Sequence, residues 1–552
     1  MTPPPRADWW KRAVVYQIYP KSFRDVTGDG VGDIRGITDR LPYLADLGVS
    51  VLWLSPIFAS PMIDNGYDTS DYTTVNPLFG TMDDADELIA EAAKRGIRIV
   101  LDIALNHTST DHPWFQNALT GGDKRDWYWF RDGRCGAAPN NWRSIFGGPA
   151  WSRSDTHGTC VSPEQYYLHL FDKSQADLNW ENPAVRAAIH DAMRFWLDRG
   201  VGGFRLDVVT VISKEPDLRD VADPRPGPLY RHIAGGPRLH EFLREMRREV
   251  FAHYDCVAIG EAPGVDPARA AKLVDPADPM LDMIYHFDLV EPKRDAAGAW
   301  DRAAFKRVFS AWDGGIGPRG WNSVVLSNHD LARIVSRFGD DGAGWRESST
   351  LLMALVLTQR GTPFVYQGDE LGMKNCPFAA YEDLDDVWAK TTYRLNREAG
   401  AGHDAAFAAA LAMTRDHART PFQWDAGLHA GFSTATPWLT VNPDHATLNA
   451  AAQADDPSSP LAFTQRLIAM RTADPLWIFG AFEDAAPDHP DVFHFTRTFE
   501  GRRAHVVLNL RGRTTPYGVP DEPLLLCNHG GPAPADSLRP WEARITAPAP
   551  AS

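Results

Sequence analysis

The sequence predicts an α/β protein built on a closed (β/α)8 TIM barrel. Short, almost continuously apolar segments recur along the chain, as in parallel strands that are buried on both faces. Segments with helical periodicity separate them, which predicts repeated βαβ units. The length of 552 residues accommodates one barrel of about 250 residues together with smaller domains. A doubly wound open sheet is the structural alternative.

Eight segments have the composition of buried strands. In order, they are residues 14–20, 49–55, 98–105, 203–207, 257–261, 283–287, 322–330 and 363–370. Between them, residues 87–95 (ELIAEAAKR) and 185–198 (VRAAIHDAMRFWLD) repeat apolar side chains at helical spacing. Eight strands that alternate with helices favour the closed barrel.

Two regions fall outside this alternation. Residues 107–176 separate the third and fourth strands, and this stretch is too long for an ordinary loop and too aromatic to remain unfolded. A second, shorter insertion is expected at about 375–418, and residues 492–498 and 504–510 alternate like antiparallel strands. We therefore expect a barrel at 1–106 and 177–480, an inserted domain at 107–176, and a C-terminal antiparallel β-sandwich at 481–552.

Composition excludes several classes of function. The chain has 56 Lys and Arg against 72 Asp and Glu, a net charge of −16, which disfavours nucleic acid as a partner. Its five cysteines form no disulfide framework and no metal-binding spacing. The N-terminus does not resemble a signal peptide, and no apolar run is long enough for a transmembrane helix. We expect a cytoplasmic protein with no membrane partner and no organic cofactor, either a monomer or a weak homo-oligomer.

Polar side chains stand where several predicted strands end. They are Asn106, His107, Asp207, Glu261, His329 and Asp330, with Arg205 two residues before Asp207. In a (β/α)8 barrel these strand ends meet at one mouth, where active sites form. Helix caps and ion pairs are the alternative reading of the same residues.

Two carboxyl groups that face each other across a bond suit glycoside hydrolysis, one as a nucleophile and one as an acid. Arg205 would keep Asp207 ionised. Glu261, in the sequence GEAPG without a cationic neighbour, is better placed to stay protonated.

The ordered motifs DIALNH (102–107), GFRLD (203–207), IGE (259–261) and SNHD (327–330) resemble the four conserved regions of the α-amylase family, glycoside hydrolase family 13. Residues 9–23 (WWKRAVVYQIYPKSF), 175–179 (QADLN) and 417–425 (HARTPFQWD) resemble its oligo-1,6-glucosidase group, which includes α-glucosidases and sucrose isomerases. The resemblance implies Asp207 as nucleophile, Glu261 as general acid/base and Asp330 as transition-state stabiliser. It also implies retention, with the first two carboxyl groups about 5–5.5 Å apart.

The resemblance also implies a pocket for one terminal glucose of a short oligosaccharide. Asp64 and Tyr67, in the motif DNGYD, would close it together with Arg419. The implied substrate-binding residues are Asp64, Tyr67, His107, Phe146, Phe171, Gln175, Arg205, Val208, His329 and Arg419. A pocket closed at one end implies an exo-acting α-glucosidase.

Val208 follows the implied nucleophile directly. In the oligo-1,6-glucosidase group a Val at this position accompanies preference for α-1,6 bonds, whereas Thr or Ala accompanies preference for α-1,4 bonds. The resemblance therefore implies an enzyme that prefers isomaltose-type ends to maltose. The alternative is that Val208 only packs the barrel.

A separate motif, DVTGDGVGD at residues 25–33, places oxygen ligands at the spacing of an EF-hand loop. Gly36 stands where an EF-hand has its bidentate Glu. Relatives in the group often hold Ca²⁺ here. We expect a structural Ca²⁺, with Mg²⁺ as an alternative, bound by Asp25, Thr27, Asp29, Val31 and Asp33. A Gly- and Asp-rich turn that binds nothing is the other interpretation.

Two other functions remain open on the same scaffold. Sucrose isomerases carry Arg-Leu-Asp-Arg-Asp after strand six, where this chain has EPKRD at 291–295. Only the last two residues match, although 345–349 (WRESS) and 358–364 (TQRGTPF) are closer to that branch. Leu331 and Ala332 replace the usual Gln-Pro after Asp330, which leaves the aglycone preference open between hydrolysis, isomerisation and transglucosylation. A non-catalytic, transporter-associated barrel is a remote alternative, since all three carboxylates are present.

Overall fold

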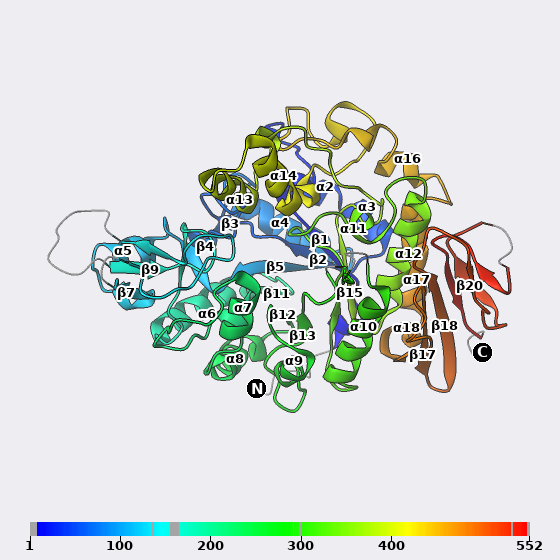
Figure 1. Ribbon diagram of the computed structural model, residues 1–552, viewed down its shortest axis with the longest axis horizontal. Helices are drawn as coiled ribbons and strands as arrows, with labels where there is room; N and C mark the ends of the chain where they lie inside the picture. The colour runs from blue at the N-terminus through cyan, green and yellow to red at the C-terminus, as the bar shows by residue number, and fades with distance from the viewer. Residues whose placement is uncertain are drawn as a thin grey trace.

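Eight parallel strands form the centre of the molecule (Figure 1). The computed structural model describes residues 8–134, 137–154, 165–290, 292–296, 300–530 and 534–548. The strands are β1 (Val15–Ile18), β2 (Val51–Leu54), β5 (Arg98–Ala104), β11 (Gly203–Asp207), β12 (Val257–Glu261), β13 (Met283–Tyr285), β14 (Ser323–Val324) and β15 (Thr362–Tyr366). Their order is β13-β12-β11-β5-β2-β1-β15-β14, and a parallel bridge between Ile284 and Asn322 closes the ring. The predicted barrel is confirmed.

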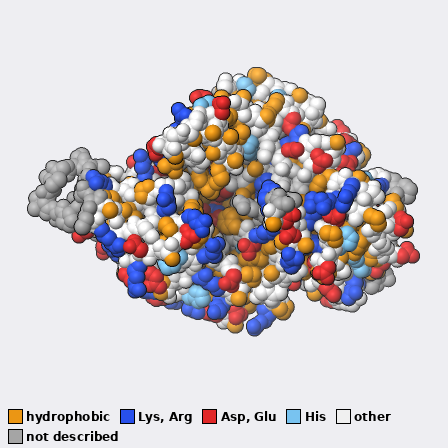
Figure 2. All heavy atoms as spheres, viewed as in Figure 1, with side chains coloured by type: hydrophobic (Ala, Val, Ile, Leu, Met, Phe, Trp, Pro, Cys, Tyr) orange, Lys and Arg blue, Asp and Glu red, His pale blue; other side chains and the backbone are white. Residues whose placement is uncertain are grey.

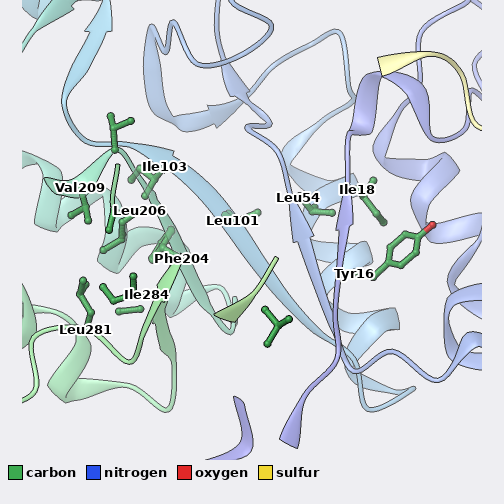
Figure 3. Packing of buried hydrophobic residues seen from close by; sticks show 14 of the residues in the cluster. Tyr16, Ile18, Leu54, Leu101, Ile103, Phe204, Leu206, Val209, Leu281 and Ile284 are labelled. Atoms are coloured by element: carbon green, nitrogen blue, oxygen red, sulfur yellow. The ribbon is translucent and has the colours of Figure 1, made fainter. Parts of the chain in front are cut away.

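Alternation along each strand divides its side chains between two cores. Outward-facing residues such as Ile18, Leu54, Leu101 and Phe204 pack in the large cluster between strands and helices (Figure 3). Their neighbours along the strands fill the barrel interior, in a second cluster that contains Val15, Val51, Trp53, Val100, Val257, Ile259, Met283, Tyr285 and Phe364. Polar residues at inward-facing positions near the strand ends therefore face one another inside the mouth.

The seventh strand is much shorter than the predicted segment 322–330. The structure forms a strand only at β14 and continues as an irregular segment through Asp330. Asn328 Oδ1 accepts a hydrogen bond from the backbone N–H of Asp330 at 2.9 Å, so a side chain replaces the ladder partner that a strand would need. Asp330 is consequently carried on a loop.

Helices surround the barrel, as the periodicity predicts. They are α1 (Trp9–Arg12), α2 (Ile34–Asp39), α3 (Leu41–Leu47), α4 (Met82–Ala93), α6 (Pro183–Asp198), α7 (Pro226–Ile233), α8 (Leu239–Glu249), α9 (Pro267–Leu273), α10 (Arg302–Ile316), α11 (Ile334–Phe338), α12 (Trp345–Thr358), α16 (Ala450–Ala454), α17 (Pro460–Ala473) and α18 (Pro475–Phe479). Side-chain caps fix where several of them begin, including a capping box between Thr81 and Asp84 at α4. Within the described part of the chain, no helix is both long and apolar enough to pass through a membrane.

A small β-rich unit projects between β5 and α6, at one end of the molecule's long axis (Figure 1). Its elements are β6 (His107–Ser109), α5 (Pro113–Leu119), β7 (Phe130–Asp132), β8 (Trp151–Arg153), β9 (Gln165–Leu168) and β10 (Gln175–Asp177). The three strands β7, β9 and β8 form one antiparallel sheet, and β10 pairs with β6 beside the barrel mouth. That second pairing brings Gln175 and His107 to the site described below.

A helical insertion follows β15 and lies over the barrel. It contains α13 (Val387–Glu398), α14 (His403–Met413) and α15 (Asp416–Arg419). It has a hydrophobic cluster of its own, which includes Cys376, Phe378, Leu384, Ala389 and Ala410.

The antiparallel strands β3 (Phe58–Ala59) and β4 (Asp71–Val75) flank the DNGYD segment at residues 64–68.

The C-terminal region forms an antiparallel sheet at the opposite end of the molecule (Figure 1). Its five strands are β16 (Ala481–Asp484), β17 (Val492–Phe499), β18 (Arg502–Asn509), β22 (Ala543–Thr546) and β20 (Leu524–Cys527), and β19 (Thr515–Pro516) pairs separately with β21 (Ser537–Leu538). The antiparallel β domain that the sequence predicts is therefore present.

Candidate active site

One buried arginine is the centre of the site. Arg205 on β11 is fully buried, and its register on β11 sets it opposite Asp102 of β5 and Ile259 of β12. Its Nη1 donates to Asp102 Oδ1 at 2.9 Å and to Asp207 Oδ1 at 2.5 Å, and its Nη2 donates to Glu261 Oε1. A single guanidinium thus holds carboxylates from three neighbouring strands.

The proton balance of this group follows from its charges. If all three acids were ionised, Arg205 would neutralise only one of three negative charges inside the protein. Burial raises the pKa of Glu261 to about 6 although Arg205 opposes the shift, and burial likewise raises the pKa of Asp207 against the same opposition. The two carboxyl groups therefore retain a proton between them up to about pH 6, and Arg205 does not by itself keep Asp207 ionised as the sequence suggested.

Asp330 has a different environment. Its Oδ1 accepts from Arg415 Nη1 at 3.2 Å and from Arg419 Nη2 at 3.0 Å, and its Oδ2 lies 3.3 Å from His329 Nε2. Burial acts to raise its pKa, but His329 and the two arginines lower the pKa well below its ordinary value. Asp330 is therefore a permanent negative charge at the mouth.

The closed end of the site is held by Asp64. Its Oδ1 accepts from Arg415 Nη2 at 2.8 Å and its Oδ2 from Gln175 Nε2 at 3.1 Å. Gln175 Nε2 also lies 3.2 Å from His107 Nε2, and the His107 ring packs against Phe171 with centroids 5.1 Å apart. Burial lowers the pKa of His107 to about 4, so its imidazole is neutral at physiological pH.

Two stacked rings form the interior side of the site, with Tyr67 in its lining and His329 behind it. Tyr67 stacks on His329 with centroids 5.2 Å apart and an interplanar angle of 6°, and its hydroxyl donates to Asp102 Oδ2 at 2.8 Å. His329 is fixed from behind by Gln17 of β1, whose Nε2 lies 2.7 Å from His329 Nδ1. Burial lowers the pKa of His329 to about 3, so it too is neutral.

These groups surround one cavity of about 890 Å³. Figure 2 shows the hollow in the middle of this face, with hydrophobic side chains around it and acidic side chains inside. Asp64, Tyr67, His107, Phe171, Gln175, Asp207, Glu261, Asp330 and Arg415 all line it. Its volume suits a small organic ligand.

Val208 has a strained backbone at the edge of this cavity. Its φ is 37° and its ψ is 39°, the left-handed region that a β-branched residue rarely adopts. The conformation directs its N–H to Glu261 Oε2 at 2.7 Å, and Val208 also lines the cavity. Strain of about 1–3 kcal/mol is thus located between the two central carboxylates.

Comparison with known proteins agrees with this geometry. Residues 17–479 match the family described as "Alpha amylase, catalytic domain". The chain belongs to the α-amylase family. It is 42% identical to an oligo-1,6-glucosidase of Parageobacillus thermoglucosidasius, over 97% of this chain and 98% of that protein. The protein is accordingly a glycoside hydrolase, as the motifs predict.

Two solved structures are similar to this chain over nearly its whole length. The trehalulose synthase MutB from Pseudomonas mesoacidophila MX-45 superposes with a TM-score of 0.93 at 40% identity, over 98% of this chain and 100% of that one. An isomaltulose synthase from Klebsiella sp. LX3 superposes with a TM-score of 0.93 at 38% identity, over 98% and 99% of the two chains.

The structure brings most of the predicted substrate-binding residues together around the cavity. Phe146 and Phe171 pack edge to face with centroids 5.7 Å apart, and both line the cavity beside Val208. Arg205 and His329 are fully buried directly behind the cavity wall. The carboxyl spacing of 5–5.5 Å stays a prediction.

Arg419 needs reassignment. It is fully buried and reaches Asp330 from behind, without lining the cavity. The arginine that faces the cavity and contacts Asp64 is Arg415, whose Nε and Nη2 donate to Asp386 Oδ1 at 2.9 and 2.5 Å. The two arginines lie one helical turn apart around α15, so their side chains occupy successive layers of the wall.

The reasoning about Glu261 also needs correction. The sequence showed no cation beside it, yet Arg205 donates to it directly. Its raised pKa comes from burial, which outweighs the guanidinium.

Several residues that support the site were missed. Asp102 is fully buried and accepts hydrogen bonds from Arg205, Tyr67 and Trp53, which orients the guanidinium. Gln17 orients His329 through a hydrogen bond, and Lys214 orients Asn106. A signal was available for Asp102 and Gln17, because each is a polar residue inside an apolar strand.

The predicted metal loop folds around its own backbone. Asp25 accepts from the N–H groups of Gly28 and Gly30 at 2.7 and 2.8 Å, and Asp33 accepts from Val26, Thr27 and Gly36. Asp29 Oδ1 accepts from the N–H of Val31 at 2.9 Å. Among the described residues, no three His, Cys, Asp or Glu side chains converge as the ligands of a metal ion would. The carboxylates of this loop are thus engaged with backbone N–H groups, and the Ca²⁺ site stays a prediction.

Proposed function

We propose that the protein is a retaining, exo-acting α-glucosidase that hydrolyses terminal α-glucosidic bonds of short oligosaccharides and prefers α-1,6 bonds of isomaltose type. The observation that carries this proposal is the bridge that Arg205 makes between Asp207 and Glu261. Two carboxyl groups that share one guanidinium are close together, which favours the shorter spacing of retaining enzymes over the wider spacing of inverting ones.

In the reaction, Asp207 attacks the anomeric carbon while Glu261 protonates the oxygen of the departing alcohol. The C1–O bond to the aglycone breaks, and a covalent glucosyl ester of Asp207 forms. Glu261 then takes a proton from water, which attacks C1 and releases Asp207. The fixed charge of Asp330 opposes the positive charge that develops on the sugar in both steps.

Exo-action rests on the closed end of the cavity. Asp64, Arg415 and Gln175 form one hydrogen-bonded wall there, with carboxylate, guanidinium and amide groups that match the hydroxyls of a terminal glucose. Tyr67 offers an aromatic face for the apolar side of that sugar.

The linkage preference is assigned to Val208 and can be tested there. We expect Val208→Thr to raise the ratio of maltose to isomaltose turnover several-fold, because the smaller, polar branch changes the entrance beside Glu261. Initial rates with both disaccharides measure the ratio, with Val209→Thr, a buried neighbour, as the control. A wild-type enzyme that turns over maltose as fast as isomaltose would contradict the preference.

Sucrose isomerisation is the second candidate, favoured by the structural similarity to two enzymes of that kind. Chromatography of the products from isomaltose, maltose and sucrose distinguishes the two functions. Glucose from isomaltose supports the α-glucosidase. Isomaltulose or trehalulose from sucrose as the main product would replace it.

A cytoplasmic location and a bound Ca²⁺ at residues 25–33 complete the proposal. The location is supported by three free thiols among the described residues, Cys256, Cys376 and Cys527, since disulfides are rare in the cytoplasm. Cell fractionation tests it. The ion is supported by the motif alone.

A further inference from the structure

A mostly buried lysine lies near the closed end of the cavity and takes no direct part in the proposed reaction. Lys21 follows β1 in the short helix η1 (Pro20–Ser22), and its side chain is 12% exposed. Its Nζ lies 3.6 Å from the centroid of the Trp438 ring, a distance at which a cation and an aromatic face attract each other. The described lining of the cavity does not include Lys21. Any influence on the substrate must therefore pass through the residues that Lys21 contacts.

One of these contacts holds the turn of the DNGYD segment. Lys21 Nζ donates to Asn65 Oδ1 at 2.8 Å. Asn65 has a φ of 49°, a left-handed backbone that Asn adopts more readily than most residues. Asp64, whose carboxylate forms the closed end of the cavity, directly precedes it. A shift of this turn would therefore displace Asp64.

A second contact reaches the helical insertion. Lys21 Nζ lies 3.7 Å from Asp385 Oδ2. The backbone N–H groups of Asp385 and Asp386 both donate to Asp416 Oδ2, at 2.7 and 3.0 Å. Asp386 Oδ1 in turn accepts from Arg415 Nε and Nη2 at 2.9 and 2.5 Å. Lys21 thus pairs with the segment that places Arg415.

The same two segments also meet inside the cavity. Arg415 Nη2 donates to Asp64 Oδ1 at 2.8 Å, across a sequence separation of 351 residues. Lys21 therefore joins from outside the two segments that Asp64 and Arg415 join at the closed end. The carboxylate of Asp385 is 38% exposed, so its ion pair contributes little by itself. The shorter hydrogen bond to Asn65 is the stronger of the two contacts.

We propose that Lys21 is a positioning residue for the closed end of the cavity. It holds the DNGYD turn against the helical insertion, so that Asp64 and Arg415 keep the alignment that binds a terminal glucose. The inference rests on the proposed function, because it assumes that glucose occupies this end. Contacts to the sugar form when the substrate binds and persist while the bond breaks, so misalignment should weaken binding more than it slows the chemistry.

Lys21→Met tests the proposal, because it removes the charge and keeps an apolar side chain over Trp438. With isomaltose as substrate, we expect KM to rise about tenfold and kcat to fall by less than about threefold. The inhibition constant of glucose, the product, should rise by a factor similar to that of KM. Lys11→Met is the matched control, because Lys11 Nζ also lies over a ring, 5.0 Å from the Trp10 centroid, and pairs with Asp8 at 2.6 Å. It should leave all three constants unchanged.

A second variant keeps the proposal testable if Lys21→Met does not fold. Asp385→Asn changes a partly exposed carboxylate and should raise KM and the inhibition constant of glucose about two- to threefold. Unchanged constants in the folded variants, or a loss of kcat without a rise in KM, would overturn the inference while the glucosidase function stands. A wild type that cleaves neither isomaltose nor maltose would instead overturn the proposed function, and the inference with it.

Discussion

Buried arginines serve opposite purposes at the two ends of the barrel. At the mouth, Arg205 contacts three carboxylates; burial acts to lower its pKa, but Asp102, Glu261 and Asp207 raise it well above the ordinary value. Where the barrel meets the C-terminal sheet, Arg471 and Arg497 are equally buried and donate to backbone carbonyls. Burial lowers the pKa of Arg471 to about 9.

The difference shows what each environment provides. A cation among carboxylates makes their protons depend on one another, which acid–base chemistry requires. A cation among carbonyls adds no group that titrates near neutral pH, but it satisfies several acceptors at once. Arg497 alone reaches the carbonyls of Thr358, Trp477 and Gly480, and so joins β17 to the ends of α12 and α18. We call this region the seam.

The most severe test removes the nucleophile. Asp207→Asn should reduce kcat by about 10⁴-fold or more, because no glucosyl ester can form. It should leave thermal unfolding almost unchanged, because the amide has the same size and its oxygen can still accept the hydrogen bond from Arg205 Nη1. Steady-state kinetics and calorimetry on the same preparation measure both. Substantial remaining turnover would refute the assigned role.

The seam should respond in the opposite way. Arg497→Met leaves several buried carbonyls without a donor, so the free energy of unfolding should fall by about 3 kcal/mol. The kcat/KM of the folded protein should not change. Denaturant unfolding and kinetics measure the two effects, and Arg503→Met, on an exposed position of β18, is the matched control. A loss of kcat/KM without a loss of stability would remove the distinction between the regions.

The pH dependence of kcat/KM tests the role of Glu261 at the barrel mouth. Glu261 acts first as an acid and must be protonated, and burial raises its pKa to about 6. We expect kcat/KM to fall as the pH rises above about 6, approaching tenfold per pH unit. Glu261→Gln should abolish this limb together with most of the activity. An activity that rises steadily from pH 6 to pH 8 would contradict the assignment.

The smallest expected effect concerns the loop at residues 25–33. Backbone N–H groups surround the Asp25 and Asp33 carboxylates there, whereas backbone carbonyls surround the arginines at the seam. If Ca²⁺ binds there, adding it to chelator-treated protein should raise the melting temperature by about 2–4 °C. Asp29→Asn should weaken that shift. Calorimetry that shows no stabilisation by Ca²⁺ or Mg²⁺ would refute the ion site, and the loop would then be a turn that binds no metal.

The barrel was predictable because its strands are buried on both faces, so composition alone marks them. The end of β14 was not predictable, since Asn328 replaces a strand hydrogen bond with a side-chain one. The three carboxylates proposed for catalysis were predicted from the strand ends and the family motifs. The Arg205–Glu261 contact depends on the register between β11 and β12, which composition does not reveal.

The choice between Arg415 and Arg419 shows a further limit. Both belong to one short segment, RDHAR, and either could have faced Asp64. Their roles are decided by Asp386, a residue of the helical insertion that binds Arg415 through Nε and Nη2. No local pattern links positions 29 residues apart in this way.

Val208 has a consequence for how such an enzyme diversifies. Its left-handed backbone favours Gly or Asn, whereas a β-branched side chain shapes the entrance beside Glu261. In a library that samples all amino acids at this position, survival after heating and activity on isomaltose should therefore enrich different residues. Substitutions at position 208 that change the substrate preference are therefore tolerated only if the rest of the barrel is stable enough to offset the backbone strain.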